Sequence, residues 1–168
     1  IITAAEAVSN INDGATIMIS GFLGTGTPEI LIDALVAKGV RHLTVIANDG
    51  GLPAKEGKTA RGVGKLLERG MIDHIIASHV GMNPLIGQGI NDVTLKCTLV
   101  PQGSLAEKIR AGGAGLGGVL TPTGVGTIVA EGKQIINIDN RDFLLEKPLK
   151  ADFSLIRASI CDEYGNYS

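Results

Sequence analysis

The residues from Ser20 to Pro28, with the sequence SGFLGTGTP, are the first in the chain whose types and spacing could serve chemistry. They lie between a short apolar run and a segment of helical spacing, so they are predicted to form a loop between a strand and a helix. Such a glycine-rich loop presents backbone N–H groups beside the positive end of a helix, which suits a phosphate or a developing oxyanion. A tight structural turn would use the same residues, and the spacing alone leaves both interpretations open.

Two well-known nucleotide-binding loops are excluded by the residues that follow the glycines. Gly21 and Gly26 have the spacing of a nucleoside-triphosphate loop, but residues 27–28 are Thr-Pro where that loop requires Lys followed by Ser or Thr. Gly24 begins a dinucleotide fingerprint whose last position is Glu29, and a side chain there would obstruct close packing of the helix. We therefore expect neither of these nucleotide sites.

Polar side chains follow two further apolar runs directly. Asn48 and Asp49 begin the sequence NDGG, and Gln102 lies in VPQG after Pro101 ends a run. Ligands of open α/β sheets bind at the carboxyl ends of the strands, so these side chains are candidates to contact a substrate at that edge. Asn, Asp and Gly are also ordinary turn residues, and a plain turn remains an alternative for residues 48–51.

Candidate nucleophiles and bases are scarce. His79 lies at a predicted strand end, where a general base could act. Cys97 and Cys161 each stand alone in apolar stretches, which predicts two buried thiols and neither a metal site nor a disulfide. Five glutamates lie on predicted helix surfaces or at a helix start, so none stands out as a buried nucleophile: Glu6, Glu29, Glu68, Glu107 and Glu131. The sequence thus predicts a binding site for a ligand, but no side chain in the chain stands out as a nucleophile or base.

The composition is that of one folded domain spanning residues 1–168. Glycine accounts for 24 residues, which is about twice the usual share of roughly 7%, while 44% of residues are hydrophobic. The net charge of −2 offers no basic stripe for nucleic acid or an anionic membrane. No apolar run approaches a membrane span, and the N-terminus has no signal-peptide pattern, so we expect a cytoplasmic protein without nucleic-acid or membrane partners.

Apolar runs of strand character alternate with segments of helical spacing. The predicted strands cover 15–20, 42–47, 73–78 and 94–100, and the predicted helices cover 3–11, 28–38, 62–69 and 104–111. Thr3 and Glu6 have the spacing of a capping box at the start of the first helix. This alternation indicates the α/β class, with an open, mostly parallel β-sheet flanked by helices. The loops that follow the strands are predicted to carry the chemistry, namely 20–28, 48–58, 79–89, 101–103 and 112–127.

The C-terminal third has a different pattern. Residues 112–127 are predicted to form a long loop of Gly, Thr and Pro, and residues 133–147 a small hairpin that turns at Asp139 and Asn140. Residues 151–162 are predicted to form one further strand. The sequence stops eight residues past Ile160 without a closing helix, which raises the expectation that it is incomplete at its C-terminus.

Residues 12–28, NDGATIMISGFLGTGTP, resemble the N-terminal signature of family I CoA transferases. The signature has an Asp-Gly turn, three apolar residues, Gly-Gly-Phe and a spaced Gly-x-Pro, and it is matched here by Asp13, Gly14, Ile17, Met18, Ile19, Gly21, Phe22, Gly26 and Pro28. Ser20 stands where the family usually has the first Gly, and we expect its side chain to tighten the loop. The similarity extends through LTVIANDGG, IIASHVGMNP, LVPQGSLAEKIRAGGAG, TPTGVGTIVAEGK and LLEKPLKADFSLIRA, so it covers nearly the whole chain. The chain looks like the α subunit of a 3-oxoacid, acetate or butyrate CoA transferase.

The resemblance implies an enzyme that moves CoA between a short-chain acyl-CoA and a carboxylic acid through a glutamyl-CoA intermediate. In this family the reacting glutamate lies in a Ser-Glu-Asn-Gly motif of a β subunit, and that tetrapeptide is absent here. The resemblance therefore implies no catalytic residue in this chain, activity only with a β subunit in an α2β2 or similar heteromer, and CoA as a substrate without a permanently bound cofactor or metal.

The resemblance also assigns candidate site residues. The stretch associated with CoA binding is Ser20, Gly21, Phe22, Leu23, Gly24, Thr25 and Gly26. Asn48, Asp49 and Gln102 correspond to positions facing the acyl group and the carboxylate substrate, and Gly113, Ala114 and Gly115 are expected to help shape the same pocket.

Several alternatives stay open. The basic residues of the 52–64 loop could attract CoA phosphates, although a solvated loop is favoured. A noncatalytic acyl-CoA or anion-binding α/β module is the alternative function, and a sugar-phosphate isomerase on the same scaffold ranks third. The sequence does not identify the acid.

Overall fold

The computed structural model describes residues 1–168, which form two compact units. The first unit comprises residues 1–98 and 151–168, and the second comprises residues 99–150. Whether the two units fold as the single domain that the sequence predicts is not tested by this division, and that domain stays a prediction.

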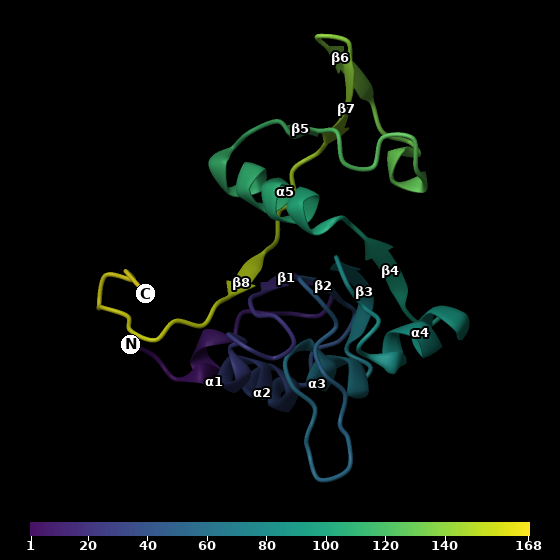
Figure 1. The fold of residues 1–168 in the computed structure, drawn as a ribbon. Helices are drawn as coiled ribbons and strands as arrows, with labels where there is room; N and C mark the ends of the chain where they lie inside the picture. Colours follow the sequence, from purple (N-terminus) through teal and green to yellow (C-terminus); the bar gives the residue numbers. More distant parts are fainter. The chain divides into compact units, whose positions relative to one another are not determined.

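The first unit is built on a five-stranded sheet with the strand order β4-β3-β2-β1-β8 (Figure 1). The strands are β1 (Thr16–Ile19), β2 (Leu43–Ala47), β3 (Ile72–Ala77), β4 (Lys96–Leu99) and β8 (Phe153–Leu155). β1 runs parallel to both β2 and β8, with Ile17 opposite Val45 on one side and Phe153 on the other, and β2 runs parallel to β3. The predicted α/β fold with a mostly parallel sheet is confirmed.

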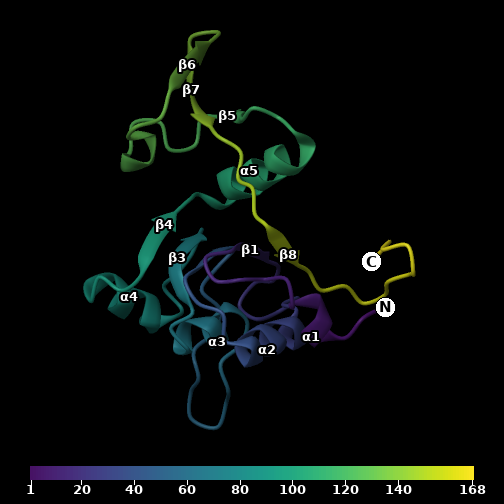
Figure 2. The ribbon, with the colours of Figure 1, turned by 180° about the vertical axis from the view of Figure 1, so that it is seen from behind.

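Four helices belong to the first unit: α1 (Ala4–Ala7), α2 (Glu29–Lys38), α3 (Val63–Glu68) and α4 (Pro84–Asn91). Both ribbon views place α1, α2 and α3 side by side along the same face of the strands (Figures 1 and 2). Ile17 and Leu43 from the sheet and Ile32, Leu35 and Leu66 from the helices are fully buried in one hydrophobic core. Burial of this apolar surface is the main stabilising term for the unit.

Local signals explain where the first two helices begin and end. Thr3 and Glu6 form the predicted capping box, in which the Glu6 N–H donates to Thr3 Oγ1 at 3.2 Å and the Thr3 N–H donates to Glu6 Oε2 at 2.8 Å. α1 is nevertheless shorter than predicted, and the ammonium of Lys38 donates to backbone carbonyls just after it. Gly39 ends α2 as predicted, with a left-handed φ of 78°.

The prediction of a loop over 79–89 is wrong in its second half, because α4 begins at Pro84. Asn83 caps this helix, with its side-chain oxygen accepting from the Leu85 N–H at 3.2 Å, and Pro84 occupies the first turn. Asn followed by Pro is a start signal for a helix that the sequence already contained. The strand predicted over 151–162 is also too long, since β8 covers three residues only.

The second unit contains α5 (Gln102–Ala114), β5 (Val119–Thr121), the 3₁₀ helix η1 (Ile128–Ala130), β6 (Ile135–Ile138) and β7 (Arg141–Glu146). Its three strands form an antiparallel sheet in the order β5-β7-β6. The hairpin turn at Asp139 and Asn140 is confirmed, and both residues have the positive φ of a tight hairpin turn, 50° and 61°. The loop predicted over 112–127 is partly wrong, because α5 extends to Ala114 and β5 lies within this range.

Glu146 at the end of β7 is a buried carboxylate, and no pattern in the sequence around it predicts its burial. Its side chain is fully buried, and its two oxygens lie 2.8 Å from Lys108 Nζ and 2.5 Å from Lys133 Nζ. Burial alone would raise the pKa of the Glu146 carboxyl, but hydrogen bonds and charge from the two lysines outweigh it and hold the pKa below its ordinary value. This cluster ties α5 and the turn before β6 to β7.

We expect Glu146→Gln to lower the free energy of unfolding by about 3 kcal/mol at pH 7, because two lysines lose their buried counter-charge. The wild-type contribution is present above the ordinary carboxyl pKa of 4.5 and is lost as the pH falls through the lower pKa of the folded state. Urea unfolding at pH 7 and in this acid range measures the effect: the difference in the free energy of unfolding between wild type and Glu146→Gln should shrink as the pH falls.

Glu107→Gln is the matched control, because Glu107 is an exposed glutamate on α5 that pairs with Arg110. An equal loss of stability in both variants would contradict the role assigned to the Glu146 cluster.

Candidate active site

The glycine loop, residues 20–26, follows β1 and leads through Thr27 and Pro28 into α2. Gly21, Gly24 and Gly26 have φ values of 117°, 79° and 68°, and Leu23 has a φ of 48°. A Cβ on Gly21 would lie 2.3 Å from Thr27 Oγ1, so this glycine lets the loop close on itself. The conformation of the loop therefore accounts for its glycines before any ligand is considered.

Asn48 and Asp49, at the end of β2, hold the glycine loop from one side. Asn48 Nδ2 donates to the Gly21 carbonyl at 2.7 Å. Asp49 is buried, with Oδ2 accepting from the Leu23 N–H at 2.9 Å and Oδ1 accepting from the Gly51 N–H at 2.7 Å. The structure thus brings together the predicted residues of the first unit, and it uses both oxygens of Asp49 to fix the backbone.

Ser20 joins the two ends of the glycine loop. Its hydroxyl donates to the Gly26 carbonyl at 3.1 Å and accepts from the Arg157 N–H at 3.3 Å. Its backbone N–H donates to the carbonyl of Leu155 in β8 at 3.0 Å. The expectation that a serine at this position tightens the loop is confirmed.

Most N–H groups of the loop are committed to internal bonds. Phe22 and Thr25 exchange a pair of backbone hydrogen bonds of 2.9 Å, and the Leu23 N–H is held by Asp49. The N–H groups of Gly21, Gly24 and Gly26 donate to no group of the protein. These are donors of this loop that an anion or a developing oxyanion could use.

The space beneath the loop is nearly closed. A cavity of about 10 Å³ lies between Gly21, Gly24, Asp49, Gly51 and Gly62. This is roughly the room that one water needs. A ligand of the loop must therefore lie on its outer side.

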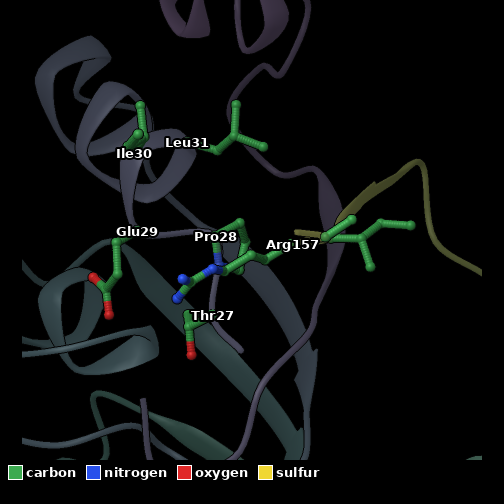
Figure 3. A pocket seen from close by; sticks show the side chains of 8 residues that line it. Thr27, Pro28, Glu29, Ile30, Leu31 and Arg157 are labelled. Atoms are coloured by element: carbon green, nitrogen blue, oxygen red, sulfur yellow. The ribbon is translucent and has the colours of Figure 1, made fainter. Parts of the chain in front are cut away.

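A larger pocket opens at the start of α2, with a volume of about 470 Å³ (Figure 3). Its lining residues are Thr27, Pro28, Glu29, Ile30, Leu31, Ile156, Arg157 and Ala158. In Figure 3 the guanidinium of Arg157 extends across the pocket toward the first residues of α2. Sequence reasoning missed Arg157, and the available signal was its place directly after the apolar run of β8.

The other predicted site residues belong to the second unit. Gln102 is exposed and is the first residue of α5, whereas Gly113 and Ala114 lie in the last turn of this helix and Gly115 ends it with a φ of 70°. The 13 residues of α5 span about 20 Å, so Gln102 and Gly115 lie about that far apart, and a pocket that contacts both must extend along the helix. A role for either end at the glycine loop stays a prediction.

Reactive side chains are as sparse in the structure as in the sequence. His79 is exposed, and its backbone pairs with that of Asp49. Cys97 is half-buried, and burial raises the pKa of its thiol, whereas Cys161 is exposed, so the prediction of two buried thiols is wrong for Cys161.

No three His, Cys, Asp or Glu side chains gather closely enough to hold a metal ion. No helix is long and apolar enough to span a membrane.

We expect Asp49→Asn to lower the free energy of unfolding by about 2 kcal/mol, because an amide can accept only one of the two backbone hydrogen bonds and turns a donor toward the other. Hydrogen exchange of the Leu23 amide should become faster in this variant. Asp92→Asn, at the exposed end of α4, is the control and should leave the exchange of Leu23 unchanged. Unchanged exchange in Asp49→Asn would contradict the assigned contact.

Comparison with known proteins identifies the family. The family model described as "Coenzyme A transferase" matches residues 1–168. The acetate CoA-transferase subunit alpha of Escherichia coli K12 is 49% identical over 166 residues, which are 99% of this chain and 73% of that protein. The acetoacetyl-CoA:acetate/butyrate CoA transferase alpha subunit of Clostridium acetobutylicum is 49% identical over 158 residues, which are 94% of this chain and 70% of that protein.

A solved structure supports the same assignment. An acyl-CoA transferase from E. coli O157:H7, crystallised as a thioester complex with CoA, superposes with a TM-score of 0.82 at 27% identity. The match covers 99% of this chain, and this chain spans 36% of the length of that one. The resemblance found in the sequence is confirmed, and the chain belongs to the coenzyme A transferase family as one of its α subunits.

Proposed function

We propose that this chain works with a β subunit to move CoA between a short-chain acyl-CoA and a carboxylic acid of the acetate, acetoacetate and butyrate class. The observation that carries the proposal is the glycine loop, in which the family signature residues are fixed in place while the N–H groups of Gly24 and Gly26 remain uncommitted. The names of the two relatives at 49% identity support the substrate class.

The proposed reaction needs a carboxylate that this chain does not provide. Its one buried glutamate, Glu146, is paired with two lysines. The family resemblance implies that the reacting glutamate belongs to the β subunit. That carboxylate attacks the thioester carbon, and CoA leaves as a thiolate, which forms an acyl-glutamyl anhydride. The thiolate then attacks the glutamyl carbonyl, which releases the first carboxylic acid as its carboxylate and leaves a glutamyl-CoA thioester. The incoming carboxylate reverses the two steps and leaves as the new acyl-CoA.

The contribution of this chain is to hold donors where negative charge develops. In each step a carbonyl oxygen gains charge, and the N–H groups of Gly24 and Gly26 would stabilise that oxyanion. Loss of one such donor typically costs about 3 to 4 kcal/mol of transition-state stabilisation. Asn48 and Asp49 keep the donors in place through the Gly21 carbonyl and the Leu23 N–H. Gln102, Gly113, Ala114 and Gly115 are proposed to shape the acyl pocket from the second unit.

The proposal includes the assembly and the cofactor use. The β subunit is the partner, in an α2β2 or similar heteromer, and CoA is a substrate that is bound only during turnover. No metal or permanently bound cofactor is part of the mechanism, and the enzyme is proposed to work in the cytoplasm.

We expect the purified chain alone to exchange no CoA, and its mixture with a matching β subunit to convert acetoacetate and acetyl-CoA into acetoacetyl-CoA and acetate. Chromatography of the CoA thioesters measures the exchange. Mass spectrometry of the mixture should find the glutamyl-CoA adduct on the β subunit. Exchange by the chain alone, or an adduct on this chain, would overturn the division of roles. Binding of acyl-CoA without exchange in the complex would favour a noncatalytic binding module.

We expect Gln102→Ala to lower kcat of the α/β complex by about 10²-fold, because the resemblance implies that Gln102 faces the acyl group, where its amide could donate to the developing oxyanion. Gln88→Ala, which removes an exposed amide from α4, is the matched control and should keep wild-type kcat. Steady-state kinetics with both substrates measures the effect. Unchanged kcat in Gln102→Ala would remove this residue from the site.

A further inference from the structure

Arg61 lies at the end of an exposed hairpin, residues 52–61, to which the proposed function gives no role. Leu52 and Arg61 exchange backbone hydrogen bonds of 3.1 and 3.0 Å, and Lys55 and Lys58 pair closer to the turn. In both ribbon views this segment projects beyond α2 and α3 (Figures 1 and 2). The chain then enters α3 after Gly62, so Arg61 occupies the point where the hairpin meets the body of the unit.

The side chain of Arg61 packs on the glycine loop at Gly24. One terminal N–H of its guanidinium donates to the Gly24 carbonyl at 2.8 Å. A Cβ on Gly24 would lie 3.1 Å from the Cβ of Arg61 and 3.2 Å from its Nε, so the arginine packs directly on this glycine. About half of the Arg61 side chain, 52%, remains exposed.

Arg61 is itself held at the start of α2. Its Nε lies 3.9 Å from Glu29 Oε1, and the same oxygen accepts from the Gly62 N–H at 2.9 Å. The second oxygen of Glu29 lies 2.7 Å from Lys65 Nζ, which also lies 2.6 Å from Asp33 Oδ1. The guanidinium therefore connects the middle of the glycine loop to charged residues on α2 and α3.

Three carbonyls of the glycine loop are held by three different side chains. Asn48 donates to the carbonyl of Gly21, Arg61 to that of Gly24 and Ser20 to that of Gly26. Because a peptide group is planar, a held carbonyl also fixes the plane of the peptide that it belongs to. Arg61 thus restricts rotation of the backbone between two uncommitted donors, the N–H groups of Gly24 and Gly26.

We infer that Arg61 is a positioning residue for the acyl-CoA half of the reaction. It acts through the Gly24 carbonyl, and it keeps the N–H groups of Gly24 and Gly26 in fixed orientations. Without it the loop samples more orientations, and binding of the CoA thioester must first restrict them. The inference rests on the proposed function, since it assigns the glycine loop to the CoA thioester.

The test compares Arg61→Met, Arg61→Lys and wild type in the assembled α/β complex. We expect Arg61→Met to raise KM for acyl-CoA by about tenfold, the equivalent of one charge-assisted hydrogen bond, with KM for the free acid unchanged. Arg61→Lys should recover part of this loss, because an ammonium can still donate to the Gly24 carbonyl. Arg69→Met removes the same charge from an exposed position at the end of α3 and should match wild type. A KM for acyl-CoA in Arg61→Met equal to that of the control would overturn the inference.

An acyl-pantetheine substrate separates positioning from direct pairing with a phosphate of CoA. This thioester lacks the nucleotide phosphates, so the defect of Arg61→Met should persist with it if Arg61 acts through the loop. Disappearance of the defect would overturn the inference and make Arg61 a phosphate ligand.

Hydrogen exchange of the full chain without its partner gives a readout that does not depend on turnover. The amide of Thr25, which donates to the Phe22 carbonyl at 2.9 Å, should exchange faster in Arg61→Met than in Arg69→Met. If the wild-type complex exchanges no CoA, the proposed function fails, and this measurement alone decides whether Arg61 restricts the loop. Equal exchange in the two variants would overturn the inference.

Discussion

The first unit depends on one buried carboxylate, that of Asp49, whose two oxygens both accept hydrogen bonds from backbone N–H groups. Asp49 accepts from Leu23 in the glycine loop and from Gly51 in its own loop, so two connections of the parallel sheet are fixed against each other. A buried carboxylate is tolerated only when hydrogen bonds replace its hydration. The loop conformation and the buried side chain of Asp49 therefore depend on each other, and Asn48, Ser20 and Arg61 add further hydrogen bonds to the glycine loop.

The sequence was sufficient for the features that arise from local signals. Periodicity and turn residues predicted the parallel sheet, the capping box at Thr3 and the hairpin at Asp139 and Asn140. The place of the glycine loop beside Asn48 followed from the rule that strand ends share one edge of the sheet. The start of α4 also has a local signal, because Asn83 followed by Pro84 is typical of the beginning of a helix.

The features that sequence reasoning missed depend on partners that are distant in the chain. Glu146 is separated from Lys108 by 38 residues, and nothing in its own surroundings marks it as buried. The backbone hydrogen bonds of Asp49 were not predicted, because a polar residue after a strand looks the same in sequence whether it contacts a ligand or the backbone, and its predicted place facing a substrate stays a prediction. Arg61 was grouped with the basic residues of a solvated loop, and its contact with Gly24 becomes visible only when the hairpin is folded.

The narrow space beneath the glycine loop bears on how acyl-chain preference could change in this family. The space between the loop and the strand ends holds about one water, so enlarging it for a longer acyl group would disturb the residues that Asp49 holds by hydrogen bonds. Substitutions that change the acid preference would then be found at residues that do not support the loop. A chimaera that keeps this frame and borrows those surfaces from a relative is the economical route to altered selectivity.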